Sequence, residues 1–325
     1  MYKVISFGEM LVDMLSNRIS DAKDNGQEHF TKFPGGAPAN VAAAVARLGG
    51  KSYFTGKLSR DMFGRFLKNA LVEMGVKTDY IRYSDDKKTA LAFVSLDEEG
   101  ERSFEFYRDD TADLDFKISD FNPCWFDGSG IFHICSNTLT TTKIFKTTLA
   151  GLKLAKSAGW LVSFDVNLRL NLWREGANPA SRIWQCLALS DIIKLSKEEL
   201  EYLSLGEDRN ITINRMFKNG GAVVIVTDGA KPIHYYIKDI KSVYEPPTVQ
   251  IVDSTGAGDA FVGGLLYSFA KEKITPEKLS KMNVNSKTLI EAIKFASLCG
   301  AYAVTKKGAL TSLACQSDIT SFSRG

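Results

Sequence analysis

Short apolar runs alternate with segments of helical spacing along most of this 325-residue chain. The helical segments are Val41–Leu48, Phe63–Met74, Thr142–Ser157, Glu198–Tyr202 with its continuation, and Asn210–Lys218. The apolar runs predict buried strands at Val4–Phe7, Ser52–Thr55, Gly130–Ile134, Leu161–Asp165, Ile192–Leu195 and Ala222–Thr227. This alternation predicts an α/β fold with a doubly wound, mostly parallel sheet flanked by helices. Ligands of such sheets bind at the carboxyl ends of the strands, so polar residues just after the strands are candidates for a site.

Two stretches interrupt the alternation and predict a small β-sheet. Glu28–Phe33 has strand character, and Thr89–Leu96 and Arg102–Arg108 flank a glycine-containing loop at residues 97–101, as in a hairpin. We expect one domain over residues 1–325, with about 10–33 and 88–112 inserted in it as a β lid. An open β layer leaves unpaired edges and an apolar face, so we expect a homodimer that forms through this lid.

Composition argues against nucleic-acid and membrane partners. The 41 basic and 38 acidic residues give a formal charge of +3, which is too small for either surface. The five cysteines are scattered without a Cys-x-x-Cys pair, which is typical of reduced thiols. No run approaches the roughly 18 apolar residues that span a bilayer, and Glu9 and Asp13 interrupt the apolar N-terminus, unlike a signal peptide. We therefore expect a cytoplasmic protein.

The run Val252–Gly264, with sequence VDSTGAGDAFVGG, carries the strongest chemical signal. A strand-like stretch, Thr248–Val252, precedes it, and an apolar helical stretch, Ala260–Ala270, follows. The glycine turn at residues 256–258 should therefore lie at the N-terminus of a helix. Free backbone N–H groups and the helix dipole favour an anion there, and glycine lets a phosphoryl group approach the backbone closely.

Asp259 falls in the first turn of this predicted helix. A carboxylate there can take a proton from an attacking hydroxyl while the N–H groups hold the phosphoryl group. The alternative is a tight turn in which Asp259 only caps a helix; the longer context, with Asp253 and Thr255, argues against it. Other nucleotide motifs are missing: position 45 is Val where a P-loop ending in Gly50-Lys51-Ser52 needs glycine, and no Gly-x-Gly-x-x-Gly follows the first strand.

A second run, Phe33–Gly50, opens with Gly35 and Gly36 and continues as a helix of small residues. Asn40 is a polar residue in the first turn of this helix, where its amide can hydrogen-bond two ligand hydroxyls. Alternatively, the glycines form a plain turn and Asn40 satisfies local backbone groups.

Together the two runs resemble the N-terminal and C-terminal signatures of the ribokinase-like carbohydrate kinase family, most closely its fructokinases. They lie about 220 residues apart, in the order of that family, and the resemblance covers essentially the whole chain. It implies a ribokinase-like fold, ATP and Mg²⁺ as cofactors, and transfer of the γ-phosphoryl group to a primary hydroxyl of a sugar. Fructose, giving fructose 6-phosphate, is the substrate that the resemblance favours.

The resemblance also implies a catalytic group and a sugar site. In the family, the aspartate of the glycine turn is the base and the turn is the anion hole. The matching catalytic residues are Asp259, Gly256, Ala257, Gly258 and Arg169. The residues implied to contact the sugar are Asp13, Gly35, Gly36, Asn40, Phe106, Arg108 and Arg169. Each of three of these residues has an alternative role. Asp13 could be a solvated carboxylate, Arg108 a surface arginine, and Arg169 part of a structural salt bridge.

Nucleotide and metal contacts follow in the same way. The implied nucleotide-binding residues are Asn167, Lys194, Ser196, Thr227, Gly229, Gly256, Gly258 and Ser297. Glu199 is implied to organise Mg²⁺ through water. A monovalent cation, expected to be potassium, is implied at Asp253, Thr255, Ala303, Lys306 and Gly308, through backbone atoms except at Asp253. Asp228 and Pro232 depart from the family, in which an apolar residue and a second glycine are usual.

Several other functions stay open. The segments Cys299–Thr311 and Asp165–Trp173 are also similar to aminoimidazole riboside kinases. A 2-keto-3-deoxygluconate kinase would need a basic group for the substrate carboxylate, and Arg108 could supply it. A catalytically silent sugar-binding regulator is a non-enzymatic alternative, against which the intact Asp259 and glycine turn argue.

Overall fold

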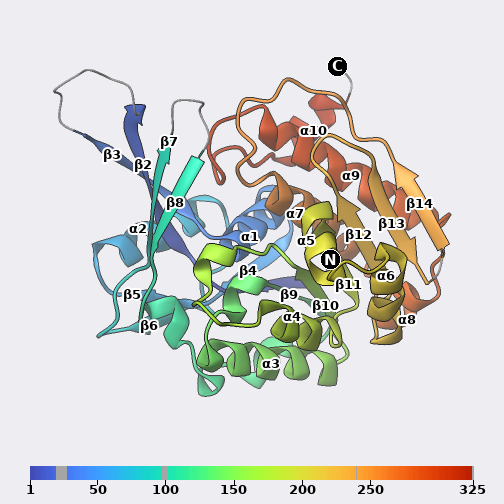
Figure 1. Ribbon diagram of the computed structural model, residues 1–325, viewed down its shortest axis with the longest axis horizontal. Helices are drawn as coiled ribbons and strands as arrows, with labels where there is room; N and C mark the ends of the chain where they lie inside the picture. The colour runs from blue at the N-terminus through green and yellow to red at the C-terminus, as the bar shows by residue number, and fades with distance from the viewer. Residues whose placement is uncertain (20–27, 97–101, 239, 324–325) are drawn as a thin grey trace.

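The computed structural model describes residues 1–19, 28–96, 102–238 and 240–323. Its larger sheet has the strand order β14-β13-β12-β11-β10-β9-β1-β4 (Figure 1). Strands β4 to β12 of this order are parallel, whereas β13 and β14 are antiparallel. The strands are β1 (Lys3–Phe7), β4 (Lys51–Thr55), β9 (Gly130–Cys135), β10 (Leu161–Asp165), β11 (Ile192–Ser196), β12 (Val223–Thr227), β13 (Ile233–Ile237) and β14 (Ile240–Tyr244).

The predicted doubly wound, mostly parallel sheet is confirmed. Each parallel strand coincides with a predicted apolar run to within one residue at either end. These strands are buried on both faces, which is why they are apolar without alternation. The hairpin β13–β14 was not predicted, because its outer strand alternates between exposed and half-buried positions.

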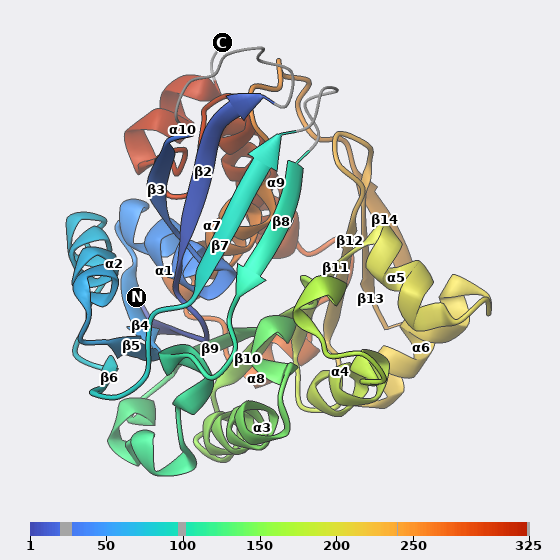
Figure 2. The same cartoon turned by 60° about the vertical axis from the view of Figure 1, so that its left-hand side comes forward.

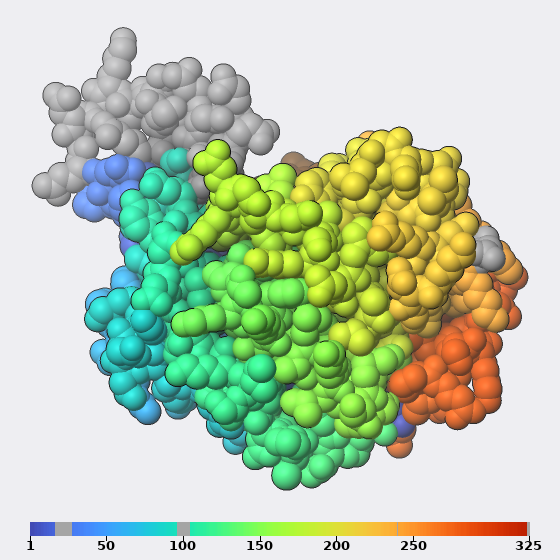
Figure 3. All heavy atoms as spheres, turned by 60° about the horizontal axis from the view of Figure 1, so that its bottom comes forward, coloured from blue at the N-terminus to red at the C-terminus, as the bar shows by residue number. Residues whose placement is uncertain are grey.

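Helices cover both faces of the sheet and divide its core into two parts. One face packs against α1 (Ala37–Arg47), α7 (Ala257–Lys271), α8 (Pro276–Ser280) and α9 (Lys287–Val304). The other packs against α3 (Thr142–Ser157), α4 (Pro179–Leu187), α5 (Lys197–Ser204) and α6 (Arg209–Lys218). In the space-filling view, α3 and α4 occupy the middle of one surface, with α5 and α6 in yellow beside them (Figure 3). At the C-terminal end, α10 (Gln316–Phe322) packs on α9.

A second sheet, of order β3-β2-β7-β8, forms the lid and stands apart from the main helical layers (Figures 1 and 2). Its strands are β2 (Leu11–Ile19), β3 (Phe30–Gly35), β7 (Leu91–Leu96) and β8 (Arg102–Tyr107). The prediction of a separate small sheet is confirmed, although β2 and β7 pair in parallel. The loop predicted at 97–101 lies outside the described residues.

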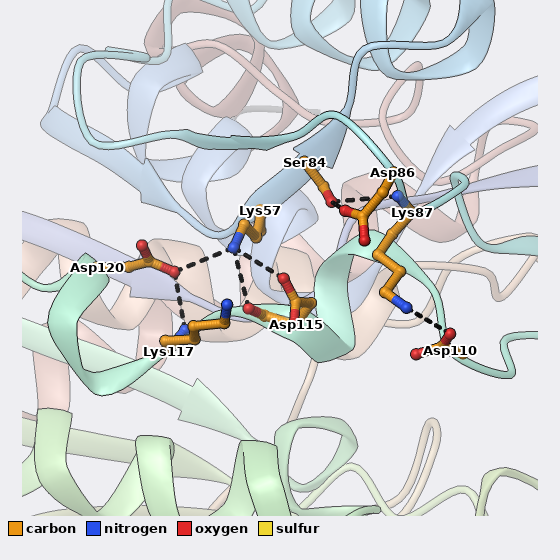
Figure 4. A network of polar contacts seen from close by, with 8 residues as sticks. All are labelled: Lys57, Ser84, Asp86, Lys87, Asp110, Asp115, Lys117 and Asp120. Carbon is orange, nitrogen blue, oxygen red and sulfur yellow. Dashed lines mark hydrogen bonds and ion pairs between the residues drawn. The ribbon is translucent and has the colours of Figure 1, made fainter.

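Charged side chains tie the base of the lid to the body. The Lys57 ammonium lies 3.0 Å from Asp115 and 3.3 Å from Asp120, and the side chain of Lys57 is 9% exposed (Figure 4). Lys87 pairs with Asp110 at 2.5 Å across the two chain segments that enter and leave the lid (Figure 4). The Lys57 pairs link β5 (Lys57–Ser59) to the 3₁₀ turns at Ala112–Asp115 and Ile118–Asp120. The other short elements of this part of the chain are α2 (Met62–Glu73), β6 (Arg82–Ser84) and the 3₁₀ turn at Pro123–Phe126.

The strand predicted at Thr248–Val252 is wrong. Ile251 and Val252 are 61% and 52% exposed, so their apolar character does not reflect a buried strand. The segment is instead irregular and is held by backbone bonds from Val252 and Asp253 to the carbonyl of Val304. No helix among the described residues combines the length and apolarity that crossing a membrane requires.

Candidate active site

The N-termini of α1 and α7 meet because the two helices approach very closely. A Cβ added to Gly263 on α7 would lie 2.3 Å from Cβ of Ala44 on α1, so only glycine permits this spacing. The close contact brings the two sequence motifs together: Asn40 Nδ2 donates to Asp259 Oδ2 at 2.8 Å. Residues 219 positions apart therefore share one site, as predicted.

The predicted glycine turn lies at the N-terminus of α7. Gly256 is the N-cap with φ of 77°, in the left-handed region, and its missing Cβ would lie 3.0 Å from Cα of Ala309. No side chain of the described residues caps this helix end. The Ala257 N–H donates to the carbonyl of Ser254 at 3.3 Å. The N–H groups of Gly258 and Asp259 lie in the same first turn, where N–H groups have no partner within the helix, and can meet an anion.

Asp259 is 7% exposed and sits in the first turn of α7. Asn167, at the carboxyl side of β10, also donates to it, at 3.3 Å from Nδ2 to Oδ1. Burial raises the pKa of Asp259 from 3.8 to about 7, and Asp165 adds to the rise, whereas the hydrogen bond from Asn40 lowers the pKa. A carboxylate with such a pKa is well matched to accept a proton near neutral pH.

The double glycine lies against Asp13 and the first strand. A Cβ on Gly35 would lie 2.2 Å from Asp13 Oδ2, and one on Gly36 would lie 2.7 Å from the carbonyl oxygen of Glu9. Asp13 pairs with Ala92 in the lid sheet, and Ala92 pairs with Phe106, so Asp13 and Phe106 share one face of the lid. The structure thus gathers these predicted sugar contacts around the start of α1.

Arg108 lies at the base of this face with its guanidinium already bonded to protein groups. Its Nε donates to Asp113 Oδ2 at 2.7 Å, and its Nη2 donates to the carbonyl of Asn137 at 3.0 Å. The side chain is 5% exposed, so it differs from the surface arginine that was the alternative. Contact with a sugar stays a prediction for Arg108.

Arg169 and Asn167 follow β10 at the carboxyl edge of the sheet. Asn167 has φ of 36°, an uncommon conformation that turns its amide toward Asp259. Arg169 is exposed, and its positive charge lowers the pKa values of both Asp165 and Asp259. Arg169 therefore lies near the base, and no ion pair with another described residue makes it structural.

Glu199 and Ser196 form a capping box at the start of α5. Ser196 Oγ accepts from the Glu199 N–H, and Glu199 Oε2 accepts from the Ser196 N–H at 2.7 Å. The other oxygen, Oε1, accepts from the Leu168 N–H at 2.7 Å. This links α5 to the loop that carries Asn167, and each carboxylate oxygen retains a lone pair that can accept from a metal-bound water.

Asp228 is accommodated in the predicted nucleotide loop by two lysines. Its Oδ2 lies 3.2 Å from Nζ of Lys231 and 3.5 Å from Nζ of Lys197. Thr227 ends β12 and Gly229 follows with φ of 56°, so the loop turns back at the carboxyl edge of the sheet. The two ammonium groups offset the carboxylate charge that would otherwise repel phosphates.

Asp253 joins the two loops predicted to hold a monovalent cation. Its Oδ1 accepts from the N–H and hydroxyl of Thr255, and its Oδ2 accepts from the Gly308 N–H at 2.9 Å. Ala303 lies in the last turn of α9, and Lys306 is directed to the hydroxyl and ring of Tyr302. Ser297 lies on the same helix with a buried hydroxyl that has no hydrogen-bond partner among the described residues.

No group of three or more His, Cys, Asp or Glu side chains gathers within the described ranges to hold a metal ion. Mg²⁺ in phosphoryl-transfer sites commonly has one or two carboxylates, with waters and substrate phosphates as its other ligands. Glu199 supplies one such carboxylate at the start of α5 and fits that pattern.

Three polar residues at the site were missed by the sequence reasoning: Glu9, Asn137 and Asp165. Glu9 is 1% exposed and accepts from Asn137 Nδ2 at 2.9 Å; Asp165 is also 1% exposed and pairs with Lys194. Each acidic residue ends an otherwise apolar stretch, and that interruption was the available signal. Asn137 gave none, since it follows its strand among other small polar residues.

Similarity to known proteins agrees with this geometry. The chain matches the model of the "pfkB family carbohydrate kinase" over residues 1–315. It is 39% identical to the probable fructokinase-5 of Arabidopsis thaliana, over 97% of this chain and 95% of that protein.

Two solved structures are similar over nearly their whole length. A fructokinase from Xylella fastidiosa with bound ATP is 43% identical with a TM-score of 0.93, covering 99% of this chain and 98% of that one. A fructokinase double mutant from Vibrio cholerae O395, with fructose, ADP and potassium ion bound, is 32% identical with a TM-score of 0.84 and the same coverage. The chain therefore belongs to the pfkB family of carbohydrate kinases.

Proposed function

We propose that this carbohydrate kinase is an ATP-dependent fructokinase that converts fructose to fructose 6-phosphate. The observation that carries the proposal is Asp259, a buried carboxylate with a raised pKa beside the uncapped N-terminus of α7. Fructokinases about 40% identical along the whole chain support fructose over other sugars.

In the proposed reaction the oxygen of the primary hydroxyl bonds to the γ-phosphorus as the bond from that phosphorus to the β–γ bridging oxygen breaks. Asp259 accepts the hydroxyl proton and later releases it to solvent, while ADP leaves with the bridging oxygen. The N–H groups of Gly256 and Gly258 and the guanidinium of Arg169 stabilise the charge on the phosphoryl oxygens. General-base assistance of this kind contributes about 10²–10⁴-fold to the rate.

The sugar would lie between the double glycine and the lid. Gly35, Gly36 and Asn40 would contact its hydroxyls from α1, and Asp13, Phe106 and Arg108 would contact it from the lid side. Closure of the lid over the sugar would exclude water, which otherwise competes as acceptor.

The nucleotide would lie along the carboxyl edge of β10, β11 and β12. Its phosphates would face Asn167, Lys194, Ser196, Thr227 and Gly229, and its base would lie against Ser297. Magnesium bound with ATP neutralises charge on the phosphates, and Glu199 would hold it through water.

We further propose a potassium site beside the glycine turn. Asp253 accepts from the backbone N–H groups of Thr255 and Gly308, which holds these two loops side by side. This contact between the loops supports a cation site formed by their carbonyl groups. Replacing potassium by sodium or tetramethylammonium should lower kcat; equal activity in all three salts would remove this site from the account.

A homodimer through the lid is proposed from the aromatic residues on one lid face. Phe93 makes edge-to-face contacts with Phe30 and with Tyr107, at 5.3 and 5.2 Å between centroids, and Phe30 and Tyr107 are 39% and 56% exposed. Light scattering at micromolar concentration should give twice the chain mass; a monomer would contradict the dimer. A cytoplasmic location is proposed from the five free cysteines, and cell fractionation tests it.

The substrate is tested by ADP release over a panel of fructose, ribose, aminoimidazole riboside and 2-keto-3-deoxygluconate, each with Mg²⁺ and ATP. Fructose should give the highest kcat/KM. A higher kcat/KM with aminoimidazole riboside or the keto acid would replace fructose while leaving the kinase chemistry in place. Sugar binding without turnover on every member would instead indicate a silent regulator.

A further inference from the structure

A buried ion pair lies beneath the glycine turn, and its acidic member has no part in the mechanism above. Asp165 ends β10 and Lys194 lies opposite it in register on the parallel neighbour β11. Nζ of Lys194 is 3.1 Å from Oδ1 and 3.2 Å from Oδ2 of Asp165, and the two side chains are 10% and 2% exposed. Taking both charges out of water costs free energy that their mutual attraction only partly offsets, so such a pair is costly to keep without a use.

The ammonium of this pair touches the turn that would hold the phosphoryl group. A Cβ placed on Gly258 would lie 3.2 Å from Nζ of Lys194, so the ammonium lies beside the turn and a side chain at position 258 would crowd it. Asp165 Oδ1 is close to Nζ but receives no aligned hydrogen bond. Lys194 has three N–H donors, so one or more of them can point away from Asp165 toward the turn.

We propose that Asp165 is a positioning residue for phosphoryl transfer, which holds the Lys194 ammonium against the Gly258 end of the anion-binding turn. The proposal rests on the kinase function proposed above and adds a residue to it. The anion site would then consist of backbone N–H groups on one side and a fixed ammonium on the other. A charge fixed in advance stabilises a developing negative charge without having to reorganise during the reaction.

The pair also sets the charge around the base. Asp259 accepts hydrogen bonds from Asn40 on α1 and from Asn167 after β10. The charged groups that act on it are Asp165 on β10, Lys194 on β11 and Arg169 in the loop after β10, and Cys135 on β9 interacts with it as well. Asp165 raises the pKa of Asp259, and Lys194 lowers it. Because the two charges lie together, their opposite effects on the pKa of Asp259 largely offset each other.

The test is a double-mutant cycle of Asp165→Asn, Lys194→Met and the combined variant, read by kcat, by the KM values for ATP and fructose, and by the pH profile of kcat/KM. Lys194→Met should lower kcat about 100-fold, as loss of one preorganised donor does. Asp165→Asn should lower it about 10-fold, as loss of an outer partner does. KM for fructose should stay within about threefold in both, because the pair faces the phosphoryl side.

The combined variant should have the kcat of Lys194→Met to within about threefold, because Asp165 acts through Lys194. In Asp165→Asn the acidic limb of the pH profile should move to lower pH, since a charge that raises the pKa of Asp259 is removed. A purely structural pair would lower thermal stability but leave kcat per folded molecule and the pH limb unchanged, which would overturn the proposal. Additive losses in the combined variant would also overturn it.

A second ion pair provides the matched control. Lys156 Nζ lies 2.7 Å from Asp191 Oδ1 just before β11, at the opposite end of that strand from the site. Asp191→Asn and Lys156→Met should leave kcat unchanged. If Asp165→Asn fails to fold, the combined variant, which buries no unpaired charge, still gives the comparison with Lys194→Met. A wild-type chain inactive on the whole sugar panel would refute the proposed function, whereas an active one with a normal Asp165→Asn variant would refute only this inference.

Discussion

Replacing Asp259 by Asn removes the proposed base while keeping its shape. Turnover should fall about 10²–10⁴-fold, because an amide cannot accept the hydroxyl proton. Fructose affinity should change little, since the amide can still hydrogen-bond a hydroxyl. A coupled assay of ADP release gives kcat, and calorimetric titration with fructose gives the dissociation constant.

The same substitution should raise the free energy of unfolding, and the size of this gain follows from the burial of Asp259. Holding a carboxylate whose pKa rises from 3.8 to about 7 in the ionised form costs at most about 4 kcal/mol. An amide at this position must meet two donors, Asn40 and Asn167, and Asn40 can offset this by presenting its unpartnered Oδ1. We therefore expect a gain of about 1–3 kcal/mol in the free energy of unfolding at pH 8.

The gain should depend on pH in a defined direction. Below about pH 4 the carboxyl group is protonated in both folded and unfolded chains, so the substitution should gain little. As pH rises from about 4 to 7, the unfolded chain loses this proton first, and the wild type loses stability that the variant keeps. Urea unfolding at pH 5 and pH 8 measures the difference, with Asp61→Asn as a control that should destabilise, because hydrogen bonds to its side chain lower the pKa of Asp61. Near-normal turnover would refute the assigned base, and a pH-independent or negative change in stability would refute the burial reasoning.

Three further substitutions or conditions test other parts of the site. The acidic limb of kcat/KM in the wild type should fall near pH 7, the pKa of Asp259, and a profile flat from pH 5.5 to 8.5 would contradict this. Gly263→Ala places a Cβ within 2.3 Å of Cβ of Ala44 and should lower the free energy of unfolding by about 1–3 kcal/mol. Urea unfolding measures this, with Lys153→Ala at an exposed position as the control. Unchanged stability would show that α1 and α7 separate easily. Asp228→Leu removes a carboxylate beside the phosphate loop and should lower KM for ATP about two- to threefold at low salt but not at 0.5 M salt, because exposed charges are screened; a raised KM would mean that Asp228 serves mainly to orient Lys197 and Lys231.

The parallel strands could be predicted from sequence because burial on both faces leaves a continuous apolar run. The outer hairpin could not, since β14 is exposed at Ile240 and Val243 and its pattern is not distinct from a loop. Thr248–Val252 shows the converse failure: β-branched residues predicted a strand, but no strand among the described residues pairs with them. Strand propensity reports a side chain's fit to a pleated surface and cannot show that such a surface is present.

The site was predictable where one residue's chemistry is set by local sequence. Asp259 directly follows a glycine turn and begins an apolar helical stretch. Its position in the first turn of a helix could therefore be predicted without knowing which other elements pack around it. Arg108 and Asp165 differ, because the Asn137 carbonyl that Arg108 binds and the Lys194 that Asp165 binds each lie 29 residues away, and only the fold brings them together. Lys194, the one lysine in its buried strand, was a usable sign that a carboxylate must lie nearby.

The central claim is that this chain transfers a phosphoryl group from ATP to the 6-hydroxyl of fructose. Incubation with fructose, ATP and Mg²⁺, followed by phosphoglucose isomerase and glucose-6-phosphate dehydrogenase, measures fructose 6-phosphate directly. With NADP⁺ supplied to the dehydrogenase, we expect one NADPH per ADP formed, and no product from the Asp259→Asn variant above about 1% of the wild-type rate. ADP formed without NADPH, or fructose 6-phosphate made equally well by the variant, would contradict it.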